Sequence, residues 1–167
     1  MPAASDILPR MGALLFVHVA ISLVGIASGF VVVFAMLAAR PLPGWTALFL
    51  WTTVATSVSG FPLPAKHFMP SHTIGILSLI ALAIALLALY RRKLAGGWRV
   101  AYVVSAMIAL YFNVFVLVVQ SFRHVAALEA LAPTQTEPPF AIAQGLVLVV
   151  FVALGIAAAR RFHPGSH

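Results

Sequence analysis

Four of the six histidines lie at or near the ends of long apolar runs. His18 is inside the first run, His67 and His72 precede and begin the third, and His124 closes the fourth. A neutral imidazole can ligate haem iron or another metal, or form a hydrogen bond with a quinone. His18 is the one ionisable side chain placed well inside an apolar run, so we expect any activity to depend most on it.

Two cofactor classes fit these residues. Haem b in a helix bundle needs axial imidazoles from facing helices at similar depth, whereas a quinone needs only one or two polar residues in an apolar cleft. We expect His72 to be the partner of His18 if the first and third apolar helices are neighbours. The candidate cofactor-binding residues are therefore His18, His72, His124 and Gln120.

A copper site on the outer face is a further alternative. The segment "PLPAKHFMPSHTIG" places His67, Met69 and His72 within six residues, and thioether and imidazole donors together favour copper. The chain has no cysteine, which excludes iron–sulfur clusters, disulfides and the covalent attachment of c-type haem.

The structural interpretation is that the polar residues join helices. Thr52, Thr56 and Ser59 form one stripe, and Asn113 and Gln120 share a helical face with His124. Interhelical hydrogen bonds in a membrane contribute roughly 0.6–2 kcal/mol each. We expect the face with Asn113 to point into the bundle or its outer cap, and a structural or accessory membrane subunit remains an alternative function.

The composition restricts the protein to a membrane. Of its 167 residues 63% are hydrophobic and 8% charged, and the mean hydropathy is +1.09, whereas soluble domains average about 25% charged residues. The ten basic residues are spread between apolar runs, so the net charge of +7 does not indicate nucleic-acid binding. Signatures of P-loop, Rossmann, zinc-protease and serine-hydrolase enzymes are absent, and no enzymatic reaction is assigned.

The run lengths predict an all-α helix bundle of a single membrane domain, residues 1–167. About 20 apolar residues cross a bilayer, and five runs of 17 to 28 residues are bounded by Pro, Gly or charged segments. A short helix on the outer surface is predicted at 124–131, and Gly25 and Gly29 form a GxxxG spacing that favours close helix packing. The predicted spans are 12–39, 45–61, 71–90, 98–122 and 140–159.

The basic residues predict an orientation. Seven of them fall in segments that five spans would place on one side, against three on the other side together with all three acids. Basic residues favour the cytoplasmic side, so the N-terminus is predicted outside and the C-terminus in the cytoplasm. The seven are Arg40, Arg91, Arg92, Lys93, Arg99, Arg160 and Arg161.

The segment Ser71–Gly145, about half of the chain, resembles small bacterial multi-pass membrane proteins without an assigned activity. The resemblance lies mainly in "YFNVFVLVVQ" and "LAPTQTEPPF". It implies a location in the bacterial cytoplasmic membrane, with the bilayer, other membrane subunits or a second copy of the chain as partners. It implies no site residue.

Overall fold

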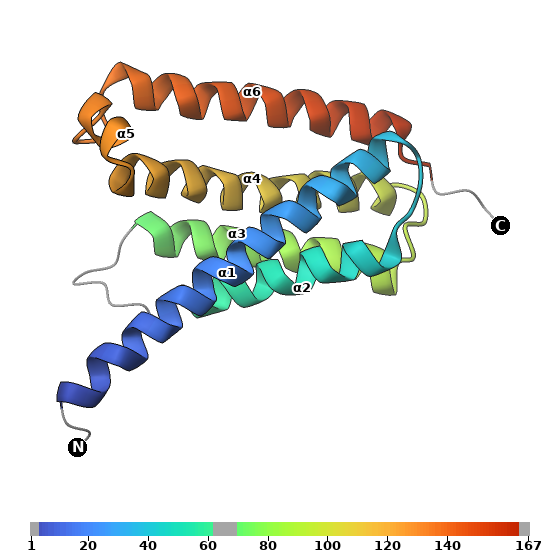
Figure 1. The fold of residues 1–167 in the computed structure, drawn as a ribbon. Helices are drawn as coiled ribbons and strands as arrows, with labels where there is room; N and C mark the ends of the chain where they lie inside the picture. The colour runs from blue at the N-terminus through green and yellow to red at the C-terminus, as the bar shows by residue number, and fades with distance from the viewer. Residues whose placement is uncertain (1–3, 62–69, 164–167) are drawn as a thin grey trace.

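The computed structural model describes the backbone of residues 4–61 and 70–163, and the side chains of residues 12–61 and 72–163. Within those ranges the fold is all-α, as predicted, with long helices that run alternately in opposite directions (Figure 1). The helices are α1 (Ala4–Leu37), α2 (Pro43–Ser59), α3 (Pro70–Leu86) with its π-helical continuation η1 (Leu87–Arg91), α4 (Trp98–His124), α5 (Ala126–Leu131) and α6 (Pro138–Arg161).

Four helices among the described residues, not the predicted five, are long and apolar enough to cross a membrane. They comprise Gly12–Leu37, His72–Arg91, Trp98–His124 and Pro138–Arg161. The prediction of a span at 45–61 is wrong by this criterion. Helix α2 has 17 residues, about 25 Å at 1.5 Å per residue, which is less than the roughly 30 Å hydrocarbon core. The protein is thus a small multi-pass helix bundle with four candidate spans.

Helix α2 nevertheless packs closely within the bundle. It contacts α1 and α3, while α4 is the central helix and contacts α1, α2, α3 and α6. Helices α1 and α3 share no extensive contact, and both pack against α2 and α4. Helix α1 has 34 residues, crosses α2 obliquely and extends past the bundle at its N-terminal end (Figure 1).

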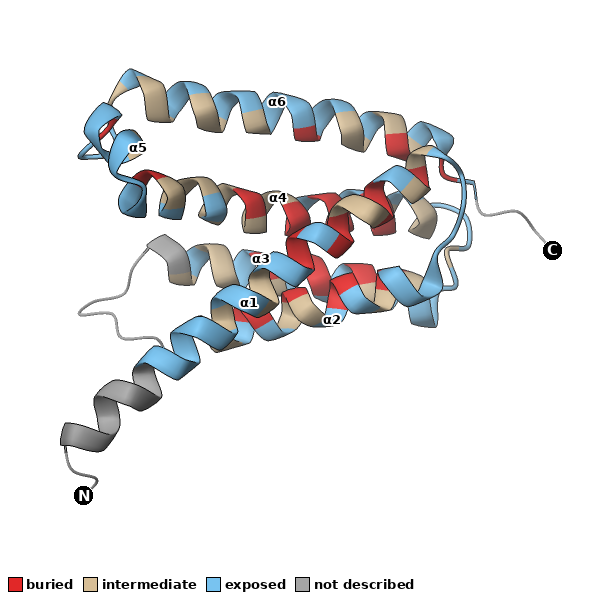
Figure 2. Ribbon diagram, viewed as in Figure 1, coloured by how far each residue is buried: buried red, intermediate tan, exposed pale blue. Residues whose placement is uncertain are grey.

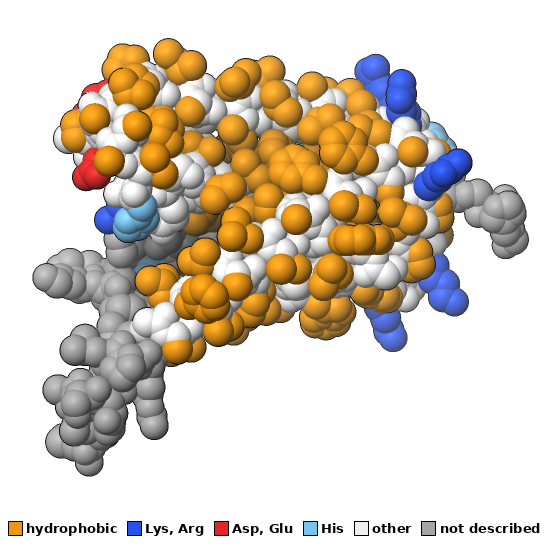
Figure 3. Space-filling model, in the orientation of Figure 1, with side chains coloured by type: hydrophobic (Ala, Val, Ile, Leu, Met, Phe, Trp, Pro, Cys, Tyr) orange, Lys and Arg blue, Asp and Glu red, His pale blue; other side chains and the backbone are white. Residues whose placement is uncertain are grey.

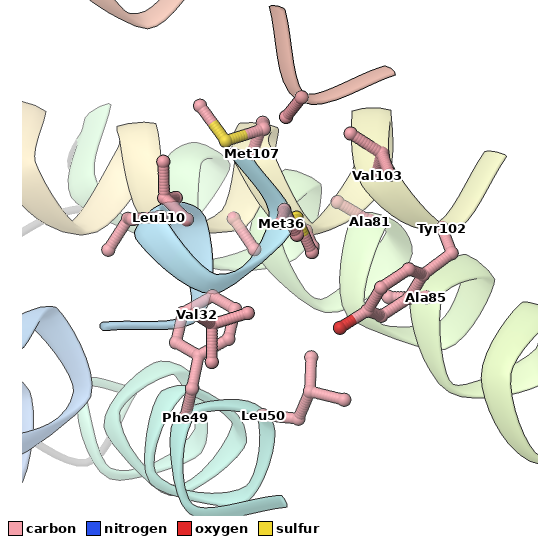
Figure 4. Packing of buried hydrophobic residues seen from close by; sticks show 14 of the residues in the cluster. Val32, Met36, Phe49, Leu50, Ala81, Ala85, Tyr102, Val103, Met107 and Leu110 are labelled. Carbon is pink, nitrogen blue, oxygen red and sulfur yellow. The ribbon is translucent and has the colours of Figure 1, made fainter. Parts of the chain in front are cut away.

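The core is concentrated in one half of the bundle. Buried residues gather around the middle of α4 and toward the end where α1 finishes, whereas α6 is exposed along most of its length (Figure 2). At the centre, Val32 and Met36 from α1 meet Phe49 from α2 and Leu110 from α4 (Figure 4). A large apolar outer surface suits contact with lipid, which is as apolar as the side chains facing it.

The two ends of the bundle differ in charge. Lys and Arg side chains gather at the end where α6 finishes, and the two described acids, Glu129 and Glu137, lie at the end with α5, together with Arg123 (Figure 3). At the first end the Arg99 guanidinium donates to the carbonyls of Ala159 (2.7 Å) and Phe162 (2.6 Å), and Arg92 lies over the Trp98 ring at 5.0 Å. A cation at these last carbonyls stabilises the C-terminus of α6.

Candidate functional site

His18 is held by the end of α2. Its ring is half-buried, and Nδ1 lies 2.8 Å from Oγ of Ser59, the last residue of that helix. Its backbone carbonyl accepts a hydrogen bond from the Ser22 hydroxyl at 2.7 Å, one turn further along α1. A Cβ on Gly60 would lie 3.6 Å from the imidazole Cε1, an ordinary van der Waals distance, so the ring packs directly beside residue 60.

The hydrogen bond to Ser59 holds the imidazole through Nδ1. The Ser59 hydroxyl also lies 3.2 Å from the carbonyl of Thr56. In one tautomer Nδ1 donates to the Ser59 oxygen, and in the other it accepts the hydroxyl proton. A histidine fixed through one nitrogen presents the other in a defined direction, as ligating histidines usually do.

His72 approaches the same end of α2 from the other side. It lies in the first turn of α3, is half-buried, and its ring centroid is 5.8 Å from that of Phe61. Residues 59–61 therefore lie between α1 and α3 at this level. Helices α1 and α3 share no extensive contact, and the partnership of His18 and His72 stays a prediction.

The face of α4 that carries Asn113, Gln120 and His124 is covered by other helices over only part of its length. Asn113 is half-buried and donates from Nδ2 to the Thr53 hydroxyl on α2 at 3.3 Å, as expected of an interhelical bond. Gln120 and His124 are exposed. The reason is that close packing is concentrated in the other half of the bundle (Figure 2), so residues further along the same face of α4 lose their cover.

His124 borders a polar hollow at the end of the bundle with α5, and this hollow has a volume of about 440 Å³. Neither His18 nor Gln120 lines it. The hollow is lined by Phe122, Arg123, His124, Glu129, Pro133, Thr134 and Gln135.

The loop over this hollow is fixed by Glu137. Its Oε1 accepts from the Thr134 hydroxyl at 2.8 Å, and its Oε2 accepts from the backbone N–H of Thr136 at 3.0 Å. Desolvation is the largest single effect and raises the pKa of the Glu137 carboxyl, but the hydrogen bonds from Thr134 and from backbone N–H groups together outweigh it and leave the pKa below its usual value. The Gln135 side chain joins the loop to α4 by donating to the Val119 carbonyl at 2.9 Å.

Polar side chains of α2 form bonds to three neighbouring helices. Besides Thr53 with Asn113 and Ser59 with His18, the Ser57 hydroxyl donates to that of Ser78 on α3 at 3.2 Å. The Thr56 hydroxyl is buried and has no hydrogen-bond partner among the described residues. The sequence indicated Thr52, Thr56 and Ser59 as a structural stripe, but it gave no sign that Ser59 would orient His18.

The remaining candidates are Gln144 and the residues predicted to bind a metal. Gln144 on α6 donates to the Phe115 carbonyl at 3.2 Å, and its Oε1 is buried without a partner in the described part of the chain. No group of three or more His, Asp or Glu that could hold a metal occurs within residues 12–61 and 72–163. His67 and Met69 of the predicted copper set lie outside the described residues.

The sequence matches no protein-family model, no curated protein and no solved structure. What is shown is a small all-helical protein with four candidate membrane-spanning helices, and no family is identified.

Proposed function

We propose that the protein binds a quinone-class ligand in the membrane, with His18 as the principal recognition residue. The observation that carries the proposal is the hydrogen bond between His18 Nδ1 and Ser59, which fixes the ring and leaves Nε2 for a ligand. Nε2 of the neutral ring accepts from a quinol hydroxyl in one tautomer and donates to a quinone carbonyl in the other. The side chains around His18 on α1, among them Leu14, Leu15 and Val19, are exposed and apolar, so an isoprenoid ligand can reach the ring from the lipid.

The geometry favours a quinone over haem b. A haem held by two histidines needs both rings to reach one iron from facing helices. The His18 ring is bonded to Ser59 and the His72 ring packs against Phe61, and their helices α1 and α3 share no extensive contact. A quinone needs only one oriented polar group in an apolar setting, and His18 supplies it.

We further propose that the protein resides in the bacterial cytoplasmic membrane with its basic end in the cytoplasm. All seven basic residues of the segments 40, 91–99 and 160–161 belong to the end where α6 finishes (Figure 3), which agrees with the positive-inside rule. Helix α2 runs between the two ends of the bundle although it is too short to count among the four candidate spans, so the start of α1 and the end of α6 lie at opposite ends (Figure 1). This orientation places His18 toward the outer leaflet. A reporter fused after residue 167 should be accessible from the cytoplasm only, and a periplasmic signal would refute the orientation.

The ligand proposal is tested with purified full-length protein and a short-chain ubiquinol that has a decyl tail. His18→Asn keeps a donor near the Nδ1 position for Ser59 but removes Nε2. We expect it to weaken quinol binding about tenfold, the equivalent of one lost hydrogen bond of about 1.4 kcal/mol. Ser59→Ala should weaken binding less, because the ring then loses its fixed orientation but keeps Nε2.

Ser121→Ala is the matched control. Ser121 is a span residue whose hydroxyl donates only to a carbonyl of its own helix, Leu117, at 2.8 Å, so its removal should leave binding unchanged. Equal quinol affinity for wild type and His18→Asn would refute the proposal.

A structural subunit is the second candidate, and the bonds from α2 to α1, α3 and α4 favour it. On this reading His18 fixes α1 to α2 and binds nothing. Ser59→Ala and His18→Leu would then lower the unfolding midpoint in detergent by similar amounts, and wild-type protein would bind no quinol. The two candidates are distinguished by the quinol titration of the wild type.

A further inference from the structure

A second cavity lies at the opposite end of the bundle from His18. It has a volume of about 190 Å³ and is enclosed by the end of α1, the start of α2, η1, α4 and the residue after α6. It is lined by Val32, Ala35, Met36, Arg40, Pro41, Leu42, Pro43, Thr46, Leu89, Tyr90, Leu94, Tyr102 and Phe162.

The cavity has an apolar wall with polar groups at its depth and its rim. The Tyr102 side chain is 2% exposed and interacts with the Thr46 side chain, so two buried hydroxyl groups border the interior. Arg40 and Tyr90 are exposed at the rim. A ligand with an apolar segment and an anionic group would contact both parts, since a guanidinium pairs strongly with phosphate.

The backbone around the cavity departs from regular helix on two sides. Helix α3 widens into the π-helix η1, whose Leu89 and Tyr90 line the cavity. Leu94 follows in the left-handed region at φ +59° and donates to the Ala88 carbonyl at 3.0 Å. Ala39, just before Arg40, is also left-handed at φ +54°. Short π-helical turns and strained residues are frequent at binding sites.

The basic side chains at this end of the bundle favour an anionic ligand. Among the described residues the segments at this end carry seven Lys or Arg and no Asp or Glu (Figure 3). Basic pockets between transmembrane helices on the cytoplasmic side bind the head groups of anionic lipids. At 190 Å³ the cavity is smaller than the roughly 300–1,000 Å³ that encloses a drug-sized ligand, so it takes only part of a larger amphiphile.

We propose that this cavity is a binding site for one anionic phospholipid, with the phosphate at Arg40 and part of an acyl chain among Ala35, Met36 and Leu89. The site is separate from His18 and does not depend on the function proposed there. It predicts selectivity for phosphatidylglycerol over phosphatidylcholine of the same acyl chains.

The test is native mass spectrometry of the full chain in detergent with either lipid added. Wild type should retain one phosphatidylglycerol in preference to phosphatidylcholine. Arg40→Gln should weaken that retention about fivefold, the change that corresponds to about 1 kcal/mol for one basic residue near anionic lipid. Ala35→Leu keeps the charge but fills the cavity, and it should also reduce retention.

The control is Arg161→Gln, which removes an exposed charge at the same end from a residue that does not line the cavity. It should retain lipid like the wild type. Equal losses for Arg40→Gln and Arg161→Gln would refute a specific site in favour of diffuse attraction. Retention of both lipids alike, or displacement of the lipid by millimolar inorganic phosphate alone, would also overturn the proposal, the latter because the site would then recognise free phosphate.

Discussion

Gly29 provides a quantitative test of the helix packing. It lies on α1 where this helix crosses α2 and α4, and a Cβ built there would lie 2.5 Å from Leu110 Cδ1 and 3.0 Å from two carbons of the Phe49 ring. Leu110 and Phe49 are 0% and 1% exposed. Because both side chains are buried, the added methyl group must displace the end of the Leu110 side chain and the Phe49 ring or shift α1 itself.

The expected cost follows from two opposing effects. Overpacking a tight core costs about 1–3 kcal/mol, whereas Gly to Ala in a helix interior gains about 1 kcal/mol of helix propensity. Gly29→Ala should therefore lower the free energy of unfolding by about 0–2 kcal/mol. Gly145 on α6 has nothing within 4 Å of an added Cβ, so Gly145→Ala should raise the free energy of unfolding by up to about 1 kcal/mol.

The difference between the two variants, about 1–3 kcal/mol, is the quantity to measure. Reversible unfolding by titration with sodium dodecyl sulfate, followed by circular dichroism, gives both values under the same conditions. The reasoning is wrong if Gly29→Ala stabilises the protein as much as Gly145→Ala, because α1 would then not approach α2 and α4 as closely as the structure has it.

Three further outcomes are expected. A double-mutant cycle of Asn113→Ala and Thr53→Val should give a coupling of about 0.6–2 kcal/mol, and zero coupling would contradict their hydrogen bond. Arg99→Met should speed hydrogen exchange at residues 159–162, whereas Arg99→Lys should do so less because it keeps the charge near the end of α6. Since the pKa of Glu137 lies below its usual 4.5, its contribution to stability is complete above that pH and is lost as the pH falls through the folded value. Proteolysis of the loop at 132–137 should then increase as the pH falls below 4.5 in the wild type but not in Glu137→Gln, and equal pH dependence would contradict this role.

The sequence predicted the helix bundle because the signal for a membrane helix is a continuous run of apolar residues, which is a local property of the chain. A run such as Trp98–Phe122 contains few groups that water could solvate, so it must form a helix and contact lipid. The prediction that α2 spans the membrane failed because its 17 residues are close to the smallest number that crosses the hydrocarbon core. Its threonines and serines are tolerated because Asn113, Ser78 and His18 on other helices supply partners, and a run read by itself does not show its partners.

The histidines also show which properties the sequence determines and which depend on the tertiary structure. The sequence by itself determined that His18 is inside an apolar run, that His72 begins one, and that the basic residues would collect at one end, because these are properties of position along a helix. Only the tertiary structure decided which helices are neighbours. It packed α2 against α1 and α3, bonded His18 to Ser59, 41 residues away, and left Gln120 exposed on a face whose inner end is covered at Asn113. Contacts between helices depend on packing angles and close approach at residues such as Gly29, and those arise from the whole bundle rather than from any one segment.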